Sequence, residues 1–267
     1  MKKNLQNKRI ILTGASSGIG REMSKILVRD YGARVIGIGR NEAKLQALAD
    51  ELDEKFSYRA FDVSVKENWL AFARELQERE EKIDFIINNA GAFPTFAKLQ
   101  DTPSETLEKI LRTNFFSCVY AAETMRTCLG EKGGIVNICS SAALCTVVGT
   151  GAYSASKAAL KGFTETLMLE EKGRYVGLIF PGTTATELFR NDENTKNSAL
   201  DLIAMKPQKM ARKIVKKIAK NRKRAVVGWD AKAMNLVAKI APVWGLKLIC
   251  FVMRKSRSKV FEKVFKE

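Results

Sequence analysis

The sequence predicts an α/β fold, a doubly wound parallel sheet with helices on both faces and a C-terminal helical extension. Short apolar runs of strand length alternate with amphipathic segments of helix length along the first 230 residues. A glycine-rich turn follows the first apolar run. The chain has 267 residues, 46% hydrophobic and 28% charged, enough for one large domain with a well-formed core. Strands that are apolar throughout and joined by helices are typical of parallel sheets covered on both faces.

The strands are expected where apolar runs meet turn residues. The first run stops at Thr13, before the glycine turn, and the sixth is ended by Pro181 and Gly182. In chain order the expected strands are residues 9–13, 33–38, 58–63, 83–88, 134–139 and 175–180, with 224–228 as a candidate seventh.

The helices are expected between these strands. Residues 19–31 are amphipathic, residues 41–55 are rich in Ala, Leu, Glu and Lys, and Thr102 and Pro103 provide a start for a long helix. In chain order the expected helices are residues 19–31, 41–55, 66–81, 104–129, 152–170 and 207–222.

The net charge of +17 is concentrated near the end of the chain. Residues 206–267 contain nineteen Lys and Arg against three Asp and Glu, whereas residues 1–205 contain 27 against 26. An anionic membrane surface, an acidic protein and nucleic acid are therefore candidate partners. The sequence has no zinc finger, RNA-stacking motif or basic zipper, so a nucleic-acid partner is not expected.

Residues 231–267 form an extension beyond the predicted sheet. Its largely apolar part carries Lys232, Lys239, Lys247 and Arg254 at steps of seven, eight and seven residues. On a helix these positions stay within about 80° of one another. Pro242 and Gly245 are expected to divide the segment into two helices, and it is too interrupted for a spanning helix. Two interpretations remain open: an interfacial helix on an anionic membrane, or a cap over the substrate cleft with solvated lysines. A lid that admits lipid-like substrates would combine them.

The composition also bears on location and metals. The N-terminal segment has no apolar run long enough for a signal peptide, so we expect a cytoplasmic protein, with peripheral membrane contact as the alternative. The five cysteines show no Cys-x-x-Cys spacing and the chain has no histidine, so we expect reduced thiols and no metal site.

The glycine-rich turn has the context of a phosphate-binding loop. Gly14, Gly18 and Gly20 follow the first strand and open the first helix. Glycines allow close backbone approach to a pyrophosphate, and the helix N-terminus supplies amide donors. The alternative is an ordinary strand-to-helix turn.

The end of the second strand bears on the choice of cofactor. Arg40 stands where a carboxylate would bind the ribose hydroxyl of NAD, and the first acidic residue is Glu42. A guanidinium suits a 2′-phosphate, so NADP(H) is the expected cofactor. The alternative is a solvated arginine at a strand end.

Acid–base chemistry in this chain must do without histidine. Tyr153 and Lys157 are four residues apart on a predicted helix, so they share one face. A phenol beside an ammonium group is one of the few remaining ways to build a proton donor. A surface helix pair is the alternative interpretation of these two residues.

Taken together, the motifs resemble the short-chain dehydrogenase/reductase family over roughly residues 8–190. The residues that carry the resemblance are Thr13, Gly14, Gly18, Gly20, Asp62, Val63, Asn88, Asn89, Ala90, Gly91, Asn114, Ser140, Tyr153, Lys157, Pro181, Gly182 and Thr186. The resemblance implies a Rossmann-type fold that binds a nicotinamide cofactor through residues 1–230. It implies that the cofactor is held by Gly14, Ser16, Ser17, Gly18, Ile19, Gly20, Arg40, Asp62, Val63, Asn89, Ala90, Gly91, Tyr153, Lys157, Pro181, Gly182, Thr184 and Thr186.

The same resemblance implies four catalytic residues. Tyr153 would be the general acid toward a carbonyl, or the base toward an alcohol. Lys157 would hold the nicotinamide ribose and favour ionisation of the tyrosine. Ser140 would polarise the substrate oxygen, and Asn114 would position a water that links Lys157 to solvent. The spacing of thirteen residues to Tyr153 selects Ser140 over its neighbour Ser141, which is expected to be a turn residue.

The expected substrate is hydrophobic. Loops after the carboxyl ends of the strands carry apolar side chains, namely Phe93, Phe96, Leu144, Val147, Val148, Leu188 and Phe189. The leading hypothesis is therefore an NADP(H)-dependent oxidoreductase that interconverts a ketone and a secondary alcohol on a steroid, bile acid or lipid. The alternatives are a 3-oxoacyl-carrier-protein reductase, which a basic tail would suit, and a non-catalytic NADP-binding sensor or membrane scaffold. A homodimer through helices 104–129 and 153–170 is expected, since the extension stands where many family members form tetramer contacts.

Overall fold

A computed structural model describes residues 4–189, 204–255 and 261–265 of the chain. Its centre is a seven-stranded sheet in the order β3-β2-β1-β4-β5-β6-β7, and every neighbouring pair is parallel. The strands are β1 (Arg9–Thr13), β2 (Arg34–Gly39), β3 (Phe56–Ala60), β4 (Ile83–Asn88), β5 (Leu129–Ile138), β6 (Tyr175–Pro181) and β7 (Arg224–Val227). The predicted doubly wound fold is confirmed, and the candidate seventh strand is present.

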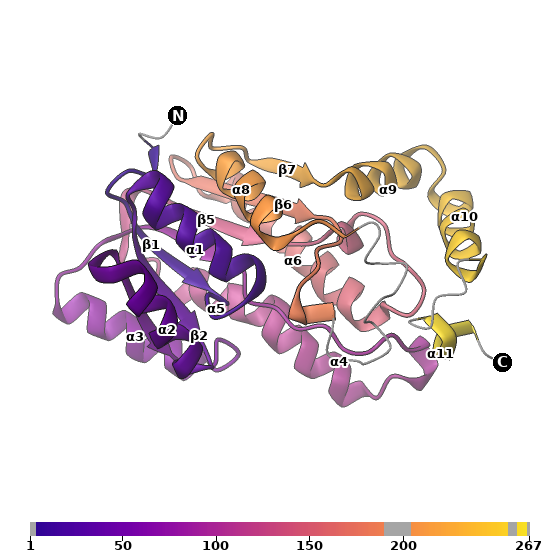
Figure 1. Cartoon of the computed structure of the whole chain (residues 1–267), viewed down its shortest axis with the longest axis horizontal. Helices are drawn as coiled ribbons and strands as arrows, with labels where there is room; N and C mark the ends of the chain where they lie inside the picture. The colour runs from indigo at the N-terminus through magenta and orange to yellow at the C-terminus, as the bar shows by residue number, and fades with distance from the viewer. Residues whose placement is uncertain (1–3, 190–203, 256–260, 266–267) are drawn as a thin grey trace.

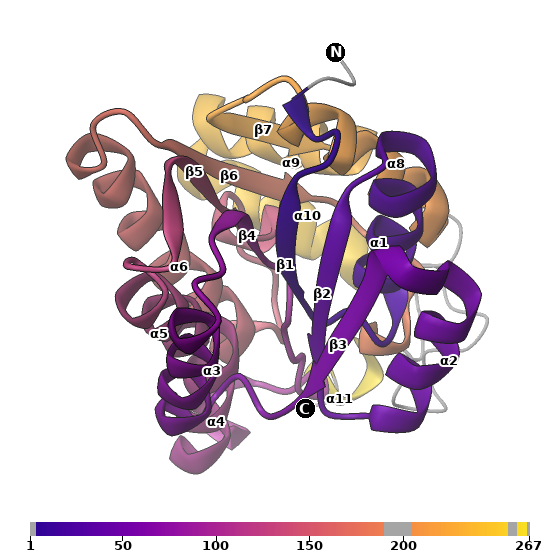
Figure 2. The same ribbon diagram turned by 90° about the vertical axis from the view of Figure 1, so that its left-hand side faces the viewer.

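Helices cover both faces of this sheet (Figures 1 and 2). On one face lie α1 (Gly18–Tyr31), α2 (Glu42–Leu52) and α8 (Pro207–Ile218). On the other lie α3 (Lys66–Glu78), α4 (Ser104–Leu111), α5 (Ser117–Thr124) and α6 (Gly151–Glu170).

Each strand contributes side chains to two hydrophobic cores, because alternate side chains point to opposite faces of the sheet. In β1, Ile10 and Leu12 pack with the core under α1 and α8, whereas Ile11 packs with the core under α3 and α5. The sheet order reverses at β1, which lies between β2 and β4. In open sheets of this kind, ligands bind beyond the carboxyl ends of the strands at such a reversal.

Several predicted boundaries were wrong, among them that of the helix expected at residues 66–81, which ends at Glu78. The third strand covers Phe56–Ala60, because its pairing with β2 runs from Val35 to Gly39, so Asp62 and Val63 follow the strand. The helix expected at residues 41–55 ends at Leu52, where Asp53 takes a positive φ of 54° and a short 3₁₀ turn follows. The helix expected at residues 207–222 ends at Ile218.

The helix expected at residues 104–129 is also interrupted. A π-helical turn, Arg112–Phe116, separates α4 from α5, and the helical run ends at Thr124. The fifth strand then begins at Leu129 rather than Gly134, and its register against β4 shifts between Ile83 and Phe85. The π-helical turn contains Asn114, one of the predicted catalytic residues.

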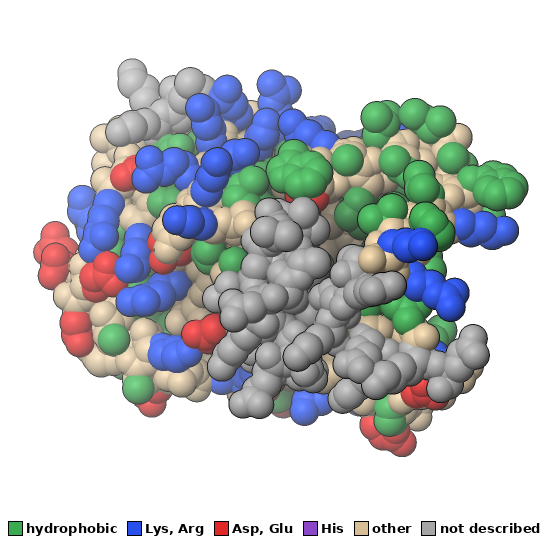
Figure 3. All heavy atoms as spheres, turned by 45° about the vertical axis from the view of Figure 1, so that its right-hand side comes forward, with side chains coloured by type: hydrophobic (Ala, Val, Ile, Leu, Met, Phe, Trp, Pro, Cys, Tyr) green, Lys and Arg blue, Asp and Glu red, His purple; other side chains and the backbone are tan. Residues whose placement is uncertain are grey.

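The extension folds into helices at one end of the sheet (Figure 1). They are α9 (Trp229–Ile240), α10 (Pro242–Lys255) and α11 (Glu262–Phe265). Pro242 begins α10, as predicted, but Gly245 does not break it; this glycine is buried where α10 crosses α9 beside Val237. The four predicted basic positions therefore form two pairs on two helices instead of one stripe. Hydrophobic side chains gather on this end of the molecule (Figure 3). None of the helices in the described ranges has the length and apolarity that crossing a membrane requires.

Candidate active site

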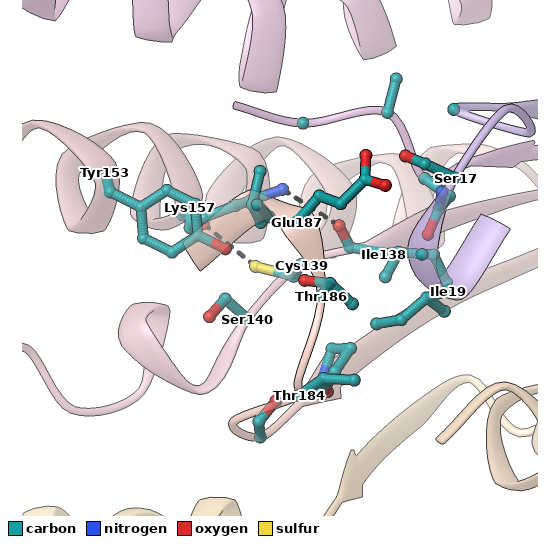
Figure 4. Close-up of a pocket in the computed structure, with 18 of the residues that line it drawn as sticks. Ser17, Ile19, Ile138, Cys139, Ser140, Tyr153, Lys157, Thr184, Thr186 and Glu187 are labelled. Atoms are coloured by element: carbon teal, nitrogen blue, oxygen red, sulfur yellow. Dashed lines mark hydrogen bonds between the residues drawn. The ribbon is translucent and has the colours of Figure 1, made fainter. Parts of the chain in front are cut away.

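A pocket of about 310 Å³ opens at the carboxyl ends of β1, β4, β5 and β6. Figure 4 shows Tyr153, Lys157 and Ser140 on one side of it, and Ser17 and Ile19 from the glycine turn on the other. The predicted site residues that line this pocket are Gly14, Ser17, Gly18, Ile19, Arg40, Asn89, Ala90, Gly91, Ser140, Tyr153, Lys157, Pro181, Gly182, Thr184 and Thr186.

The glycine turn is held against the end of β4. The Thr13 hydroxyl accepts hydrogen bonds from the backbone amides of Asn89 and Ala90, both at 2.9 Å, and Asn89 Nδ2 donates to Thr13 O at 3.0 Å. Gly14 has a φ of 69°, and a Cβ there would lie 2.9 Å from Asn89 Nδ2. At Gly20 a Cβ would collide with the Gly14 carbonyl. The turn is thus a bare backbone cradle at the N-terminus of α1, suited to an anionic group.

Four of the predicted cofactor-binding residues lie outside this pocket. Ser16 faces a neighbouring hollow beside α2, and Gly20 packs against the turn itself. Val63 is buried in the core, where its carbonyl accepts from Trp69 Nε1 at 2.9 Å. Asp62 lies 3.9 Å from the guanidinium of Arg40, whose side chain is 77% exposed.

Tyr153 and Lys157 lie in the first turns of α6. Both are buried, at 5% and 3% exposed, and the Lys157 Nζ lies 5.8 Å from the centre of the Tyr153 ring. Lys157 Nζ donates to the carbonyl of Ile138 at 3.2 Å. The Tyr153 ring packs edge-on against Phe93, with centroids 5.1 Å apart.

Asn114 lies behind this pair, fully buried in the π-helical turn. Its amide donates to the carbonyl of Ala92 at 2.9 Å and to Ser156 Oγ at 3.0 Å, and its oxygen accepts from the Ala92 amide at 2.7 Å. Both N–H groups of the side chain are thereby used. A Cβ at Gly91 would lie 3.3 Å from Asn114 Oδ1 and 3.6 Å from Lys157 Nζ. Asn114 therefore positions the chain beside the lysine, and it does not itself line the pocket.

Sequence reasoning missed three residues of the pocket: Ile138, whose carbonyl accepts from Lys157, and Cys139 and Glu187. The Cys139 thiol donates to the carbonyl of Lys157 at 3.2 Å, and burial raises the pKa of this thiol to about 11, so it stays neutral. Glu187 lines the pocket and pairs with Lys44 of α2 at 3.1 Å. In the sequence the available signal was adjacency to predicted site residues: Cys139 precedes Ser140, and Glu187 follows Thr186.

A second, apolar cavity of about 490 Å³ adjoins the first. Ser140, Tyr153 and Gly182 line both. Its other walls come from loops after β4 and β5 and from the extension, with Phe93, Phe96, Ser141, Ala142, Val147, Thr150, Thr183, Met234, Val237, Leu248, Ile249, Val252, Met253 and Phe261. All the described residues that line it are uncharged.

The sequence predicted only part of this cavity. Phe93, Phe96 and Val147 line it, whereas Leu188 lines the first pocket. Leu144 and Val148 are absent from both linings, and the side chain of Phe189 lies outside the described part of the chain. Ser141 forms a 3₁₀ turn, as expected, and also faces this cavity.

A buried carboxylate fixes the extension to the sheet. Asp230, in the first turn of α9, accepts from the Thr183 amide at 2.6 Å. A Cβ at Gly182 or Gly228 would collide with this carboxylate. This contact fixes the start of α9 at the loop that both cavities share.

Comparison with known proteins gives a consistent result. A family model described as short chain dehydrogenase matches residues 8–197. The 3-ketodihydrosphingosine reductase of Bos taurus is 28% identical over 257 residues, covering 90% of this chain and 77% of that protein. A 3beta-hydroxysteroid dehydrogenase of Mediterraneibacter gnavus is 31% identical over 201 residues, covering 73% and 70%. A solved short-chain dehydrogenase from Streptomyces avermitilis superposes with a TM-score of 0.77 at 25% identity, covering 92% of this chain and 97% of that one.

Proposed function

The chain belongs to the short-chain dehydrogenase family, and from this premise we propose that it is an NADP(H)-dependent oxidoreductase that interconverts an apolar ketone and a secondary alcohol. One observation carries the proposal. A polar pocket with a glycine cradle and an apolar cavity meet at the side chains of Ser140 and Tyr153. Cofactor and substrate would thus be brought together at a proton donor.

The residues of the first pocket fit a nicotinamide dinucleotide. The turn at Gly14 and Gly18 has no side chains that would block a pyrophosphate, and α1 directs its amide end there. Lys157 and Thr186 would hold the nicotinamide end. When bound, this cofactor supplies or accepts the hydride.

The protein's own residues would handle the proton. In the reductive direction the Tyr153 hydroxyl donates its proton to the substrate oxygen, and the Ser140 hydroxyl donates a hydrogen bond to that same oxygen. The positive charge of Lys157 stabilises the phenolate left behind. In the oxidative direction the phenolate takes the proton back from the alcohol. Asn114 acts through the backbone at Ala92 as a positioning residue.

Arg40 supports the preference for the phosphorylated cofactor. Its guanidinium lines the pocket at the end of β2, and its side chain is exposed and free to turn toward a 2′-phosphate. We expect Arg40→Ala to lower the NADPH-over-NADH preference in kcat/KM by about tenfold or more, since a charge-assisted hydrogen bond contributes about 1.5–3 kcal/mol. Lys25→Ala is the matched control, because Lys25 of α1 pairs with Glu51 of α2 and neither residue lines the pocket. An unchanged ratio in Arg40→Ala would refute the role of Arg40.

The apolar cavity supports a neutral, hydrophobic substrate. Its described lining is uncharged and is dominated by aliphatic and aromatic side chains. The two curated relatives are named for a sphingoid ketone and a hydroxysteroid. A lipid or steroid ketone is therefore the proposed substrate class.

The test is ketone-dependent oxidation of NADPH by the purified chain. The panel contains steroid, long-chain and small cyclic ketones, with a 3-oxoacyl thioester to represent the carrier-protein alternative. Turnover of the apolar ketones is the expected result. A chain that binds NADPH but oxidises it with no member of the panel would be a sensor or scaffold instead.

The proposed quaternary structure is a homodimer through the face of α4, α5 and α6. Phe116, in the π-helical turn between α4 and α5, and Leu169, on α6, are exposed, at 39% and 78%. Light scattering of the full chain gives its mass in solution, and a monomer at micromolar concentration would contradict this part of the proposal.

A further inference from the structure

Helices α9 and α10 expose an unusual amount of apolar surface. Eight of their large apolar side chains are more than half exposed, Trp229 and Leu236 among them. We call the other six, from the end of α9 onward, the α9–α10 surface: Ile240, Val243, Trp244, Leu248, Phe251 and Val252. They lie at the end of the molecule where hydrophobic side chains gather in Figure 3. Soluble monomers rarely leave so many large apolar side chains together in water, so we expect a binding partner to cover this surface.

The charges around this surface indicate what that occupant is. Residues 231–255 contain five Lys and Arg and no Asp or Glu. Two of these cations lie over aromatic rings of the surface: Lys247 Nζ is 5.0 Å from the centre of the Trp244 ring, and Lys255 Nζ is 5.7 Å from that of Phe251.

Aromatic side chains with lysines beside them match the boundary of an anionic lipid bilayer. The rings and aliphatic groups enter the acyl layer while the ammonium groups stay at the lipid phosphates. A second copy of this chain fits less well, because two surfaces of the same positive charge would face each other. Charge complementarity thus favours a lipid surface.

The α9–α10 surface is continuous with the apolar cavity. Leu248 and Val252 are 56% and 59% exposed, yet both also line the cavity that contains Tyr153. They are four residues apart and so lie one turn apart on α10. The wall of the cavity and the exposed surface are therefore two sides of the same helical turn.

We propose that the α9–α10 surface docks on an anionic membrane and that the apolar cavity takes its substrate from the bilayer past Leu248 and Val252. Docking rests on the surface alone, whereas substrate entry rests on the proposed function. Helix α10 would then both contact the membrane and border the entrance of the apolar cavity.

Vesicle binding of the full chain tests the docking without need of turnover. We expect sedimentation with vesicles of phosphatidylcholine and phosphatidylglycerol, much weaker binding to phosphatidylcholine alone, and weaker binding at higher salt concentration.

The double variant Trp244→Ser, Phe251→Ser should lose most of the vesicle binding. In Lys239→Gln, Lys247→Gln the vesicle partition coefficient should fall roughly fivefold for each lysine. Leu70→Ser is the control, an exposed apolar residue on α3 outside both proposed interfaces, and should bind like wild type.

Tryptophan fluorescence locates the contact. Trp69 is fully buried, whereas Trp229 and Trp244 are 63% and 75% exposed. Brominated phosphatidylcholine in anionic vesicles should quench the emission, and Trp244→Phe should remove most of that quenching. Absence of vesicle binding, or binding and quenching unaffected by the Trp244 variants, would overturn the docking. A dimer that the Trp244 and Phe251 changes convert to a monomer, without any vesicle binding, would assign the surface to a second copy and also overturn it.

Substrate entry is tested by comparing two ketones. For Trp244→Ser, Phe251→Ser, we expect kcat/KM to fall with a long-chain ketone presented in anionic vesicles and to stay unchanged with a small water-soluble ketone. An equal fall in kcat/KM for both ketones would refute substrate entry from the bilayer. Vesicle binding in a chain that turns over no ketone would leave docking intact and refute the proposed function.

Discussion

The two cavities of this protein meet at the same tyrosine but are built in different ways. The cofactor pocket is formed by strand ends and by backbone, fixed by hydrogen bonds such as those between Thr13 and the amides of Asn89 and Ala90. The apolar cavity is formed mainly by apolar side chains from distant parts of the chain, from Phe93 to Phe261, that pack against one another. In the first, position comes from directional bonds; in the second, it comes from the shapes of side chains.

Because of this difference, the cofactor pocket is expected to govern the chemical step, and the apolar cavity is expected to govern which substrate is accepted. A substitution in the apolar cavity changes which molecule fits, while the hydrogen bonds that hold the cofactor pocket remain. A substitution in the glycine turn disturbs the backbone itself.

The largest effect is expected at the residue that the two cavities share. Tyr153→Phe removes the proposed proton donor, so kcat should fall about a thousandfold, within the range attributed to general acid catalysis. The affinity for NADPH, measured by fluorescence titration, should change little. Tyr58→Phe is the matched control, because the Tyr58 hydroxyl donates to Gln46 on the surface of the molecule. A loss of less than tenfold would show that another group donates the proton.

A smaller effect is expected in the backbone cradle. Gly14→Ala forces a side chain onto a residue with a φ of 69° and against Asn89, so the free energy of unfolding should fall by about 1–3 kcal/mol. NADPH affinity should fall with it. Gly162→Ala is the opposite case: this glycine lies in α6 with nothing within 4 Å of an added Cβ, so the change should stabilise the fold by about 0.5–1 kcal/mol. Thermal or urea unfolding measures both variants. If Gly14→Ala were as stable as Gly162→Ala, the cradle would not require a bare backbone.

The apolar cavity should respond in selectivity alone. Met234→Trp fills space between α9 and the loops, so kcat/KM for a steroid-sized ketone should fall roughly tenfold, as changes in an apolar pocket typically cost about 1–3 kcal/mol. The values for a small ketone and for NADPH should stay close to wild type. A parallel loss on all substrates would mean that the two regions are mechanically coupled.

The smallest effect on activity is expected from thiol labelling, which compares the packing of the two regions. Burial raises the pKa of Cys139 to about 11, while Cys250 on α10 is partly exposed. At pH 8 a maleimide should modify Cys250 first and leave turnover of a soluble ketone nearly unchanged, because thiolates react and neutral buried thiols do not. Peptide mass spectrometry identifies the site. Early labelling of Cys139 would show that the cofactor pocket opens readily.

The strands and the cofactor pocket could be predicted because their signals are local. Each strand is an apolar run, and the glycine turn, Arg40 and the pair of Tyr153 and Lys157 are short motifs at strand or helix ends. Fifteen of the predicted site residues line the first pocket. The π-helical turn was not visible in this way, because its sequence continues the pattern of a regular helix. The third strand was misplaced because its limits depend on pairing with β2.

The apolar cavity could be predicted only in part, because no motif describes it. Met234, Ile249 and Phe261 meet Phe93 through the packing of the extension, and the spacing of residues in the sequence gives no sign of this. Asp230 was missed for the same reason: its role depends on Thr183, Gly182 and Gly228, and two of those residues lie almost fifty positions away. Gly245 predicted a helix break from its propensity, whereas its actual role is to let α10 approach Val237.

The π-helical turn also has a consequence for how this chain can evolve. A helix with such a turn contains one residue more than a regular helix between the same two ends. Loss of one residue from Arg112–Phe116 would return this segment to a regular helix and leave the faces of α4 and α5 largely in place. The widened turn that directs Asn114 toward Ala92 would be lost, whereas insertion of a further residue would rotate α5 relative to α4. Mutations that exchange one amino acid for another can therefore accumulate at the outer positions of this segment, whereas single-residue insertions and deletions are expected to be eliminated by selection.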